Sequence, residues 1–317
     1  MQPVLQSELY LDGGKLGVNL NTIYHKAFMS PYFFTIAIRR NGERTCFEDQ
    51  SFVPDYVIPA NHRNWCADPI LAEDHGKTYL FYEAVSNNLG RIEVVEVFDD
   101  CRVSKPTVIL ESDCHHYSYP FVFRVNDVWY MIPESSSSGE VCLYEAAVFP
   151  FRWEKKTVLL LDQLVDTTVF QQEGEWYLLS FRPRKGSEAV DGKAFHISFG
   201  EQIRLVPVLW ADQNPLEIRG AGPFICYNGK LIRPAQLNKE DQYGNGLLFY
   251  DAAVSDNRYI ETQCGCFFAE QMKVPGYEID GAHTYCRSSK YEVIDIRCRS
   301  FDLTKTPRSI RNRFRNR

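Results

Sequence analysis

Four carboxylic acids occur at matched positions in the chain. Asp68 and Asp166 each precede a tyrosine by eleven residues, as Tyr119 also does, and Glu83 and Glu134 lie fifteen residues after Asp68 and Tyr119, respectively. Cleavage or transfer of a sugar at its anomeric carbon needs one carboxyl group that protonates the leaving oxygen and another that acts as nucleophile or activates water. We therefore take Asp68, Asp166 and Glu134 as candidate catalytic residues, and Glu83 as a candidate substrate ligand.

Each of these acids also has a structural interpretation. Asp68 stands before Pro69, and an Asp-Pro step at a strand start satisfies backbone donors while the proline is tolerated there. Glu83 alone fits a solvated carboxylate at a rim. Glu134 is better supported, because the segment IPES puts it at the end of an otherwise apolar strand, beside the SSSSG loop. The equivalent place in the fifth repeat lies near Asp295.

A second group of side chains has the chemistry of a sugar-binding surface. Histidine, arginine, glutamine and tyrosine can hold sugar hydroxyls, a carboxylate or a phosphate. The candidates for substrate binding, besides Glu83, are His116, Tyr119, Arg219, Arg233, Gln236 and His283. A single histidine is more often a packed hydrogen-bonding group than a base or ligand. Trp65, Tyr117 and Tyr119 are as compatible with a core as with stacking on a sugar ring.

A segment of about fifty residues recurs along the chain. Its copies lie near 65–83, 118–134, 165–182, 220–236 and 280–297. Each has a small or polar start, a few apolar residues, a turn of Gly, Asn, Asp or Ser, and a second strand rich in aromatic and branched residues, which predicts a β-hairpin. Further strand-like runs, such as RIEVVEVF and GLLFYDAAV, lie between the copies. We therefore predict an all-β fold, a five-bladed β-propeller with four-stranded blades.

Closure of such blades into a ring would put the first strand of every hairpin around a central channel. The starts of these strands would then face one mouth of the channel, although they are far apart in sequence. The starts contain Asp68, Tyr119, Asp166 and the segments 219–222 and 280–283. These residues are therefore predicted neighbours.

The predicted propeller spans residues 1–303, in which FFTIAIRRNG supplies an outer or closing strand. Residues 304–317 form a basic tail that includes the whole of KTPRSIRNRFRNR. This tail is either a solvated, disordered end or an arm for an anionic surface or a protein partner. The net charge of −6 and the pI near 5.7 argue against nucleic-acid binding by the body of the protein.

Targeting and redox signals are few. The N-terminal MQPVLQSELYLDGG lacks a basic segment followed by an apolar one, and FMSPYFFTIAI is too short to span a bilayer, so we expect neither a signal peptide nor a transmembrane span. The ten cysteines show no zinc spacing, and the Cys264 and Cys266 pair alone makes no metal site. We expect reduced, buried thiols in a cytoplasmic protein.

The order of several motifs resembles known families. CADPILAEDHGKTYLFYE is similar to the first blade of the five-bladed glycosidases of the arabinanase/β-xylosidase and invertase/levansucrase groups, and DTTVFQQEGEWYLLSF to their third. More closely, a series over roughly residues 60–300 resembles, in order, the N-terminal domain of plant glucosamine inositolphosphorylceramide transferases, which also stands alone in many bacterial proteins. The series is ADPIL, GRIEVVEV, HYSYPFVF, YMIPES, LYEA with FPFRW, the aspartate of VDTT, RGAGPF, LIRPAQ, QYGNG and DGAHTY with VIDI.

The glycosidase resemblance implies roles for two residues. Asp68 would be the nucleophile or general base, and Asp166 would orient the acid or stabilise the transition state. In those families the general acid is typically a glutamate at the start of the fourth blade. Here the segment reads IRGAGPF, with Glu217 displaced before it. Either Glu134 or Glu83 takes the acid role, or the site binds without cleaving.

These patterns predict a carbohydrate-active protein, glycosidase- or transglycosidase-like, that acts on a carbohydrate or glycolipid in surface-polysaccharide or glycolipid metabolism. The resemblance to the plant enzymes implies that sugar-nucleotide chemistry lies in their separate C-terminal domain, so transferase activity is not carried over. No cofactor is required, and a Ca²⁺ ion near His283 would suit the central channel. The alternative is a non-catalytic glycan-binding or scaffolding module that assists a separate glycosyltransferase.

Overall fold

The computed structural model describes residues 28–186, 189–210, 218–239 and 242–302. Within these ranges nearly all regular structure is β-strand, with one short helix, α2 (Cys46–Asp49), and the 3-10 turns η1 (Ser136–Ser138) and η2 (Ala269–Gln271). The fold is therefore all-β, as predicted. No helix in this part of the chain is long and apolar enough to cross a bilayer. The predicted basic tail, 304–317, lies outside the described residues.

The first two sheets are antiparallel and follow chain order. The first sheet contains β3 (Asn64–Asp74), β4 (Lys77–Ser86), β5 (Leu89–Val97) and β6 (Thr107–Leu110). The second sheet contains β7 (Ser118–Val125), β8 (Val128–Glu134), β9 (Val141–Val148) and β10 (Arg152–Leu160). The hairpins predicted near 65–83 and 118–134 are β3–β4 and β7–β8.

The next eight strands form one sheet made of two antiparallel runs. These runs are called the third and fourth, because they follow the first two sheets along the chain. The third run contains β11 (Val165–Gln172), β12 (Glu175–Pro183), β13 (Val190–Ser198) and β14 (Arg204–Trp210). The fourth run contains β15 (Ile225–Tyr227), β16 (Lys230–Lys239), β17 (Gln242–Ser255) and β18 (Arg258–Phe268). The two runs join where β14 and β18 pair in parallel over two residue pairs. The hairpins predicted near 165–182 and 220–236 are β11–β12 and β15–β16.

The last sheet joins the two ends of the described chain. It contains β19 (Tyr277–Gly281), β20 (Tyr285–Arg287), β21 (Tyr291–Ser300), β1 (Phe33–Arg40) and β2 (Tyr56–Val57). β1 pairs antiparallel with β21 along its whole length, and β19 and β20 both pair with β21 on its other side. The FFTIAIRRNG segment therefore supplies a closing strand, as expected.

Tight turns of one kind set the register of several hairpins. Both central residues have positive φ in the turns His75–Gly76, Asn126–Asp127, Glu173–Gly174 and Asn228–Gly229. A two-residue turn of this kind is type I′, whose twist matches that of the flanking strands. The Gly and Asn residues of the repeat are thus explained by the backbone conformation that these turns require.

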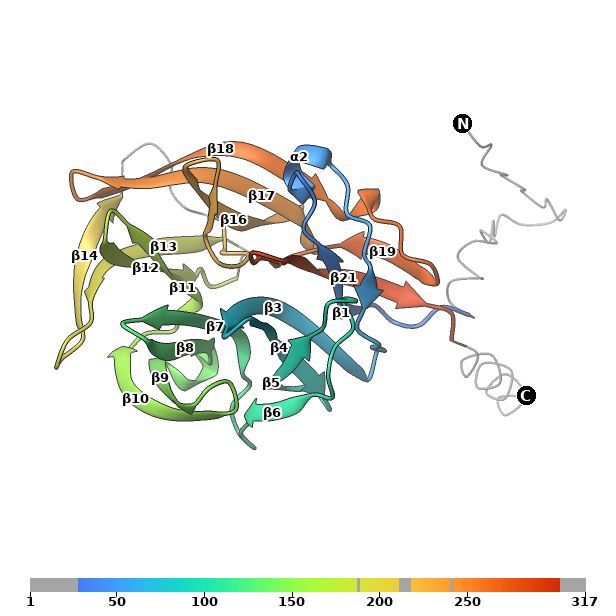
Figure 1. The fold of residues 1–317 in the computed structure, drawn as a ribbon, viewed down its shortest axis with the longest axis horizontal. Helices are drawn as coiled ribbons and strands as arrows, with labels where there is room; N and C mark the ends of the chain where they lie inside the picture. The colour runs from blue at the N-terminus through green and yellow to red at the C-terminus, as the bar shows by residue number, and fades with distance from the viewer. Residues whose placement is uncertain (1–27, 187–188, 211–217, 240–241, 303–317) are drawn as a thin grey trace, which may run out of the picture.

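Buried apolar side chains fill the spaces between successive groups of strands. One cluster lies between the first and second sheets (Phe81 with Met131), one between the second sheet and the third run (Phe121 with Leu178), one between the third and fourth runs (Phe170 with Tyr259), one between the fourth run and the last sheet (Phe249 with Ile294), and one between the last sheet and the first (Val293 with Leu80). The packing therefore returns to the sheet where it began. Figure 1 shows the sheets arranged around a common centre.

The cysteines differ from expectation in one respect. All ten are free thiols, and Cys46, Cys66, Cys101, Cys286 and Cys298 are buried, as predicted. However, Cys114, Cys226 and Cys264 are exposed. The prediction of buried thiols was wrong for these three, because a strand places alternate side chains on its two faces and a loop places them in solvent.

Candidate functional site

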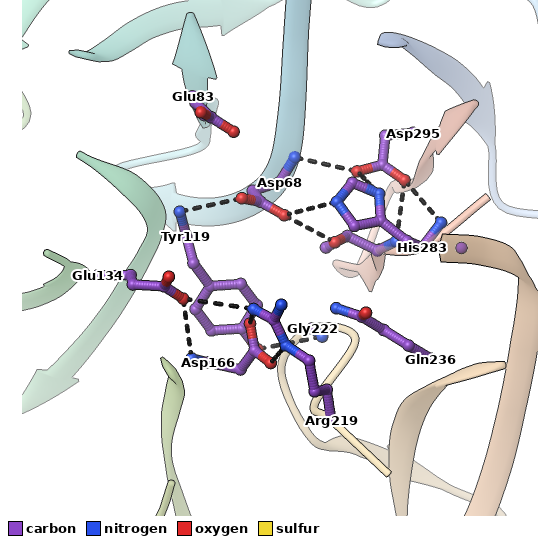
Figure 2. A network of polar contacts seen from close by, with 12 residues as sticks. Asp68, Glu83, Tyr119, Glu134, Asp166, Arg219, Gly222, Gln236, His283 and Asp295 are labelled. Carbon is purple, nitrogen blue, oxygen red and sulfur yellow. Dashed lines mark hydrogen bonds and ion pairs between the residues drawn. The ribbon is translucent and has the colours of Figure 1, made fainter. Parts of the chain in front are cut away.

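Asp68, Tyr119 and Asp166 occupy equivalent bulges in β3, β7 and β11. Their φ values are 54°, 40° and 51°, and the pairing with the second strand of each hairpin changes register at these positions. The left-handed region costs a non-glycine residue about 1 kcal/mol or more, and such strain concentrates at functional sites. Figure 2 shows their side chains in one polar group. The structure thus brings the three strand starts together, as expected.

We call this group the central cluster. It contains Asp68, Glu83, Tyr119, Glu134, Asp166, Arg219, Gly222, Gln236, His283 and Asp295 (Figure 2). Every group of strands contributes to it, so residues that are up to 227 positions apart are in direct contact.

Asp68 is held by donors from the second and last sheets. Its Oδ1 accepts the Thr284 hydroxyl at 2.9 Å and lies 3.4 Å from Nε2 of His283. Its Oδ2 accepts the backbone N–H of Tyr119 at 3.1 Å. The residue is only 7% exposed, so these contacts replace water around the carboxyl group.

Asp295, at 0% exposure, links Asp68 to His283. Its Oδ2 accepts the backbone N–H of Asp68 at 3.0 Å, and its Oδ1 accepts the backbone N–H groups of His283 and Thr284 at 3.0 and 2.8 Å. Nδ1 of His283 lies 2.7 Å from Asp295 Oδ2, which makes an ion-pair contact. The result is a buried chain of carboxylate, imidazole and carboxylate.

Burial and neighbouring charges set the protonation of this chain. Burial raises the pKa of Asp68 to about 7, although the positive charge of His283 opposes the change. Burial alone would lower the pKa of His283, but the charge of Asp295 and its contact with the ring, with Asp68 in addition, raise it to about 9. At neutral pH His283 is therefore a cation between two carboxyl groups, while Asp68 is near its midpoint.

Tyr119 is a structural part of the cluster. It is 1% exposed, its hydroxyl lies 2.9 Å from Thr168 Oγ1, and it accepts the backbone N–H of Gly222 at 3.0 Å. These contacts join the second sheet to the third run and to the segment before β15. A ring buried in this way cannot stack on a substrate, so the structure favours the core interpretation of Tyr119.

Asp166, Glu134 and Arg219 form the second charged group of the cluster. Arg219 donates from Nε to Asp166 Oδ2 at 2.7 Å and from Nη2 to Asp166 Oδ1 at 2.9 Å, a bidentate pair. Nη2 also lies 3.6 Å from Glu134 Oε2, which accepts the backbone N–H of Asp166 at 3.1 Å. Burial raises the pKa of Glu134 to about 8, and Asp166 adds to this effect while Arg219 opposes it. Glu134 is therefore largely protonated at neutral pH.

Glu83 and His116 contact each other at the edge of the cluster. Nε2 of His116 lies 2.6 Å from Glu83 Oε1, and Nδ1 accepts the backbone N–H of Gly90 at 3.0 Å. The Glu83 side chain is 6% exposed, whereas that of His116 is 42% exposed. The solvated-rim interpretation of Glu83 is therefore wrong, because β5 and the segment before β7 cover it.

Arg233 and Gln236 lie in different surroundings, although both belong to β16. Arg233 pairs with Glu261 of β18 at 2.8 and 3.0 Å, and its guanidinium lies over the Tyr250 ring. At 1% exposure it contributes to the core and not to the central cluster. Gln236 donates to the backbone carbonyl of Gly220 at 3.0 Å, and its Oε1 has no hydrogen-bond partner among the described residues.

Asp295 of the cluster and Tyr243 beside it were not among the predicted site residues. Asp295 had a weak signal, since it ends an apolar run at the place equivalent to Glu83 and Glu134. Tyr243 had none: its ring lies 5.6 Å from the Arg219 guanidinium and 5.3 Å from the His283 ring. Only the approach of β17 to the chain before β20 places it there.

Asp68, His283 and Asp295 also place potential metal ligands within 4.8 Å of one another in the described part of the chain. Ca²⁺ prefers about six to eight oxygen ligands. This set offers two carboxylates whose oxygens already accept N–H or O–H donors, and an imidazole that is cationic at neutral pH. The donor set therefore fits an internal ion pair better than a Ca²⁺ ion.

A separate cavity of about 630 Å³ lies between the second sheet and the third run. It is lined by residues that include Val125, Tyr130, Lys156 and Phe199. None of the predicted site residues lines it, so this cavity is distinct from the central cluster.

Residues 53–286 match the model of the family described as "Glucosamine inositolphosphorylceramide transferase 1, N-terminal". The chain belongs to this family. Its relatives include glucosamine inositolphosphorylceramide transferase 1 of Arabidopsis thaliana, 29% identical over 227 residues, which are 70% of this chain and 26% of that protein. The protein of the same name from Oryza sativa subsp. indica is 32% identical over 195 residues, 59% of this chain and 26% of that protein. The chain thus spans about a quarter of the length of these relatives.

Solved structures share the fold of this family member at low identity. β-1,2-Mannobiose phosphorylase from Listeria innocua superposes with a TM-score of 0.52 at 13% identity, over 86% of this chain and 98% of that one. A putative glycoside hydrolase from Parabacteroides distasonis has a TM-score of 0.51 at 10% identity, over 77% and 89%. At such identities the likeness shows the fold alone. The resemblance to the N-terminal domain of glucosamine inositolphosphorylceramide transferases and to the propeller glycosidases, inferred from the motifs, is confirmed.

Proposed function

We propose that this protein is a carbohydrate-active enzyme that cleaves or transfers a glycosidic bond at the central cluster. The observation that carries the proposal is the meeting of Asp68, Glu134 and Asp166, from separate hairpins, in one hydrogen-bonded group. Burial raises the pKa of two of these carboxyl groups, that of Asp68 to about 7 and that of Glu134 to about 8. Strongly perturbed carboxyl groups in one place are typical of catalytic sites.

The proposed architecture is a single five-bladed propeller. The eight-stranded sheet is then counted as two blades, because its two runs are each antiparallel and meet only through the short parallel pairing of β14 with β18. The apolar clusters that follow one another round the molecule support this interpretation. So does the last sheet, in which β1 completes a blade that begins near the other end of the chain.

The proposed roles follow from protonation. Glu134 is the general acid, since a carboxyl group with a pKa of about 8 holds its proton at neutral pH and can give it to the leaving oxygen. Asp68 is the nucleophile or the base that activates water. Asp166 holds Arg219 through its bidentate contact and so fixes the charge beside Glu134. Glu134 of the second sheet then takes the place of the glutamate that the IRGAGPF segment lacks.

The proposed substrate is a carbohydrate or glycolipid. The relatives are named for a transfer that involves glucosamine and inositolphosphorylceramide, and the fold neighbours for sugar chemistry. Surface-polysaccharide or glycolipid metabolism is the proposed setting. The free state of all ten cysteines supports a cytoplasmic location, and the basic tail remains a proposed arm for an anionic or protein partner.

Turnover of a panel of aryl glycosides and bacterial surface glycans tests the proposal. We expect Asp68→Asn and Glu134→Gln to lower kcat/KM by about 100-fold or more. The control is Glu154→Gln, which changes a side chain that is 71% exposed and should leave turnover unchanged. Equal turnover in all three variants would overturn the assignment of the catalytic residues.

A non-catalytic glycan-binding module is the second candidate. It is favoured by the engagement of both oxygens of Asp166 by Arg219 and of both oxygens of Asp68 by protein groups. Carboxylates saturated in this way can shape a binding surface without reacting. Binding of a glycan without turnover, weakened by Arg219→Ala, would support this candidate and exclude the first.

A further inference from the structure

The cavity of about 630 Å³ lies at the opposite end of β7 from the central cluster. Tyr119 is near the start of β7, and Val125, its last residue, lines the cavity. The extended strand between them spans about 20 Å. We call this space the turn cavity, because its wall includes residues of two turns, 125–128 between β7 and β8 and 199–203 between β13 and β14. Its volume is in the range of small-molecule sites, roughly 300–1,000 Å³.

Two aromatic rings form the apolar wall of the turn cavity. The rings of Tyr130 and Phe199 stack with their centroids 5.7 Å apart and their planes inclined by 29°. Phe199 also meets the edge of the Trp176 ring at 6.0 Å, which fixes its orientation. Phe199 is only partly buried, so it presents ring surface to a ligand. A fixed aromatic surface of this kind suits a ligand with one apolar face.

The Tyr130 hydroxyl is an unpaired polar group at this wall. The residue is only 9% exposed. Its hydroxyl has no hydrogen-bond partner in the described part of the chain, and it is not one of the enclosed polar atoms there. The hydroxyl is therefore open to the cavity that Tyr130 lines. Because polar groups of buried side chains are normally paired, this hydroxyl is suited to a hydrogen bond with a ligand.

A β-bulge brings Lys156 to the same cavity. The pairing of β10 with β9 changes register between Lys155 and Thr157, so Lys156 is the extra residue. Bulges redirect side chains and are common next to functional sites. Nζ of Lys156 forms an ion pair with Glu145, which lies across from Tyr130 in β9. The charge of this lysine is thus neutralised within the protein.

The turn between β13 and β14 supplies further hydrogen-bonding groups. Glu201 and Gln202 line the cavity, and in the described ranges neither side chain has a hydrogen-bond or ion-pair partner. They offer an amide donor and several acceptor oxygens. Because Lys156 is paired and Glu201 is an unpaired carboxylate, the cavity disfavours an anionic ligand. The same polar groups disfavour a hydrocarbon chain, which would leave them without water.

We propose that the turn cavity is a second sugar site, separate from the central cluster, that binds one or two units of a neutral saccharide. One face of the sugar packs on Phe199 and Tyr130. Its hydroxyls bond to the Tyr130 hydroxyl and to the side chains of Glu201 and Gln202. In the choice of a sugar as ligand the inference rests on the proposed function, but binding here needs no catalysis.

Gly200 allows the cavity to be filled without strain. It lines both the turn cavity and an adjoining cavity of about 450 Å³. Its φ is not in the left-handed region, and the nearest neighbour of an added Cβ is 3.9 Å away. Gly200→Leu should therefore fold and occupy the space. The matched control is Gly42→Leu in the turn after β1, where an added Cβ has its nearest neighbour at 3.6 Å.

The test is a methyl NMR titration of the full chain, ¹³C-labelled at valine, with glucose, mannose, galactose and cellobiose, each up to about 50 mM. We expect at least one sugar to shift the signals of Val125 and Val128, which line the cavity, in a saturable way. Gly200→Leu should abolish these shifts, and Gly42→Leu should retain them. Tyr130→Phe, which removes only the hydroxyl, should raise Kd about 3- to 10-fold.

The absence of a saturable shift with all four sugars would overturn the inference, and so would shifts that persist in Gly200→Leu. Inorganic phosphate and 1-hexanol are the probes for an anion and for a hydrocarbon chain. If either of them shifts the signals of Val125 and Val128 while no sugar does, the assigned ligand class is wrong. An unchanged Kd in Tyr130→Phe would exclude the role given to its hydroxyl. Absence of glycoside turnover in the wild-type protein would count against the proposed enzyme, while sugar-dependent shifts at these valines would still establish the second site.

Discussion

The first three hairpins and the fourth reach the central cluster with different backbones. In β3, β7 and β11 a residue with a side chain adopts positive φ and turns that side chain inward. The segment before β15 instead runs through Gly220, Ala221 and Gly222, and its charged group comes from the preceding Arg219. The comparison shows that the repeated backbone sets where the chain meets the centre, whereas the chemical group presented there is specific to each hairpin.

Gly222 of the fourth segment differs most from the bulge residues of the first three hairpins, because a side chain does not fit there. A Cβ at Gly222 would lie 1.9 Å from the Tyr285 carbonyl oxygen, and its φ is 127°. We expect Gly222→Ala to lower the free energy of unfolding by more than about 4 kcal/mol, measured by urea denaturation. Gly229→Ala is the control, because it has φ of 74° but no neighbour within 4 Å, and should cost about 1–2 kcal/mol. Equal losses would show that conformation alone, not close approach, requires a glycine at 222.

The fifth segment presents a cation, so its contribution depends on pH. The pKa of His283 is about 9 in the folded protein and about 6.5 in an unfolded chain. Its stabilisation is therefore complete below pH 6.5 and is lost as the pH rises through 9, a total of about 3 kcal/mol. Urea denaturation from pH 6 to pH 10 should show the loss, and the ¹³Cε1 signal of His283 should titrate near 9. A midpoint near 6.5 would contradict the ion pair with Asp295.

The strand start of the second hairpin contributes the neutral hydroxyl of Tyr119, for which the expected effect is smallest. Tyr119→Phe removes the acceptor of the Gly222 N–H and the partner of Thr168 Oγ1. We expect a loss of about 1–2 kcal/mol in the free energy of unfolding, because buried donors are left unpaired. In the Thr168→Val background the loss should be smaller, since one of the two contacts is already absent. If Tyr119→Phe lowers the free energy of unfolding equally in both backgrounds, the contact with Thr168 does not contribute to the loss.

The sequence was a good guide to hairpins and a partial guide to the site. Strand pairs, their turns and their order followed from apolar patterning and from Gly and Asn positions, which are local properties. Asp68, Tyr119 and Asp166 were found because a fixed distance to a tyrosine marked them. Tyr243 was missed and Arg233 was placed with the wrong neighbours, since their partners, Arg219 and Glu261, come from other parts of the chain.

By itself the sequence determined the all-β class, the repeated hairpins, the family and the side chains available at each strand start. Only the tertiary structure decided which of two arginines in the fourth segment serves the cluster: Arg219 meets Asp166, while Arg233 meets Glu261 in the core. The structure also decided that Tyr119 is a buried support and that Asp68 lies beside His283. The physical reason is that local patterning fixes the path of each hairpin, whereas burial, charge pairing and protonation depend on contacts between residues far apart in the chain.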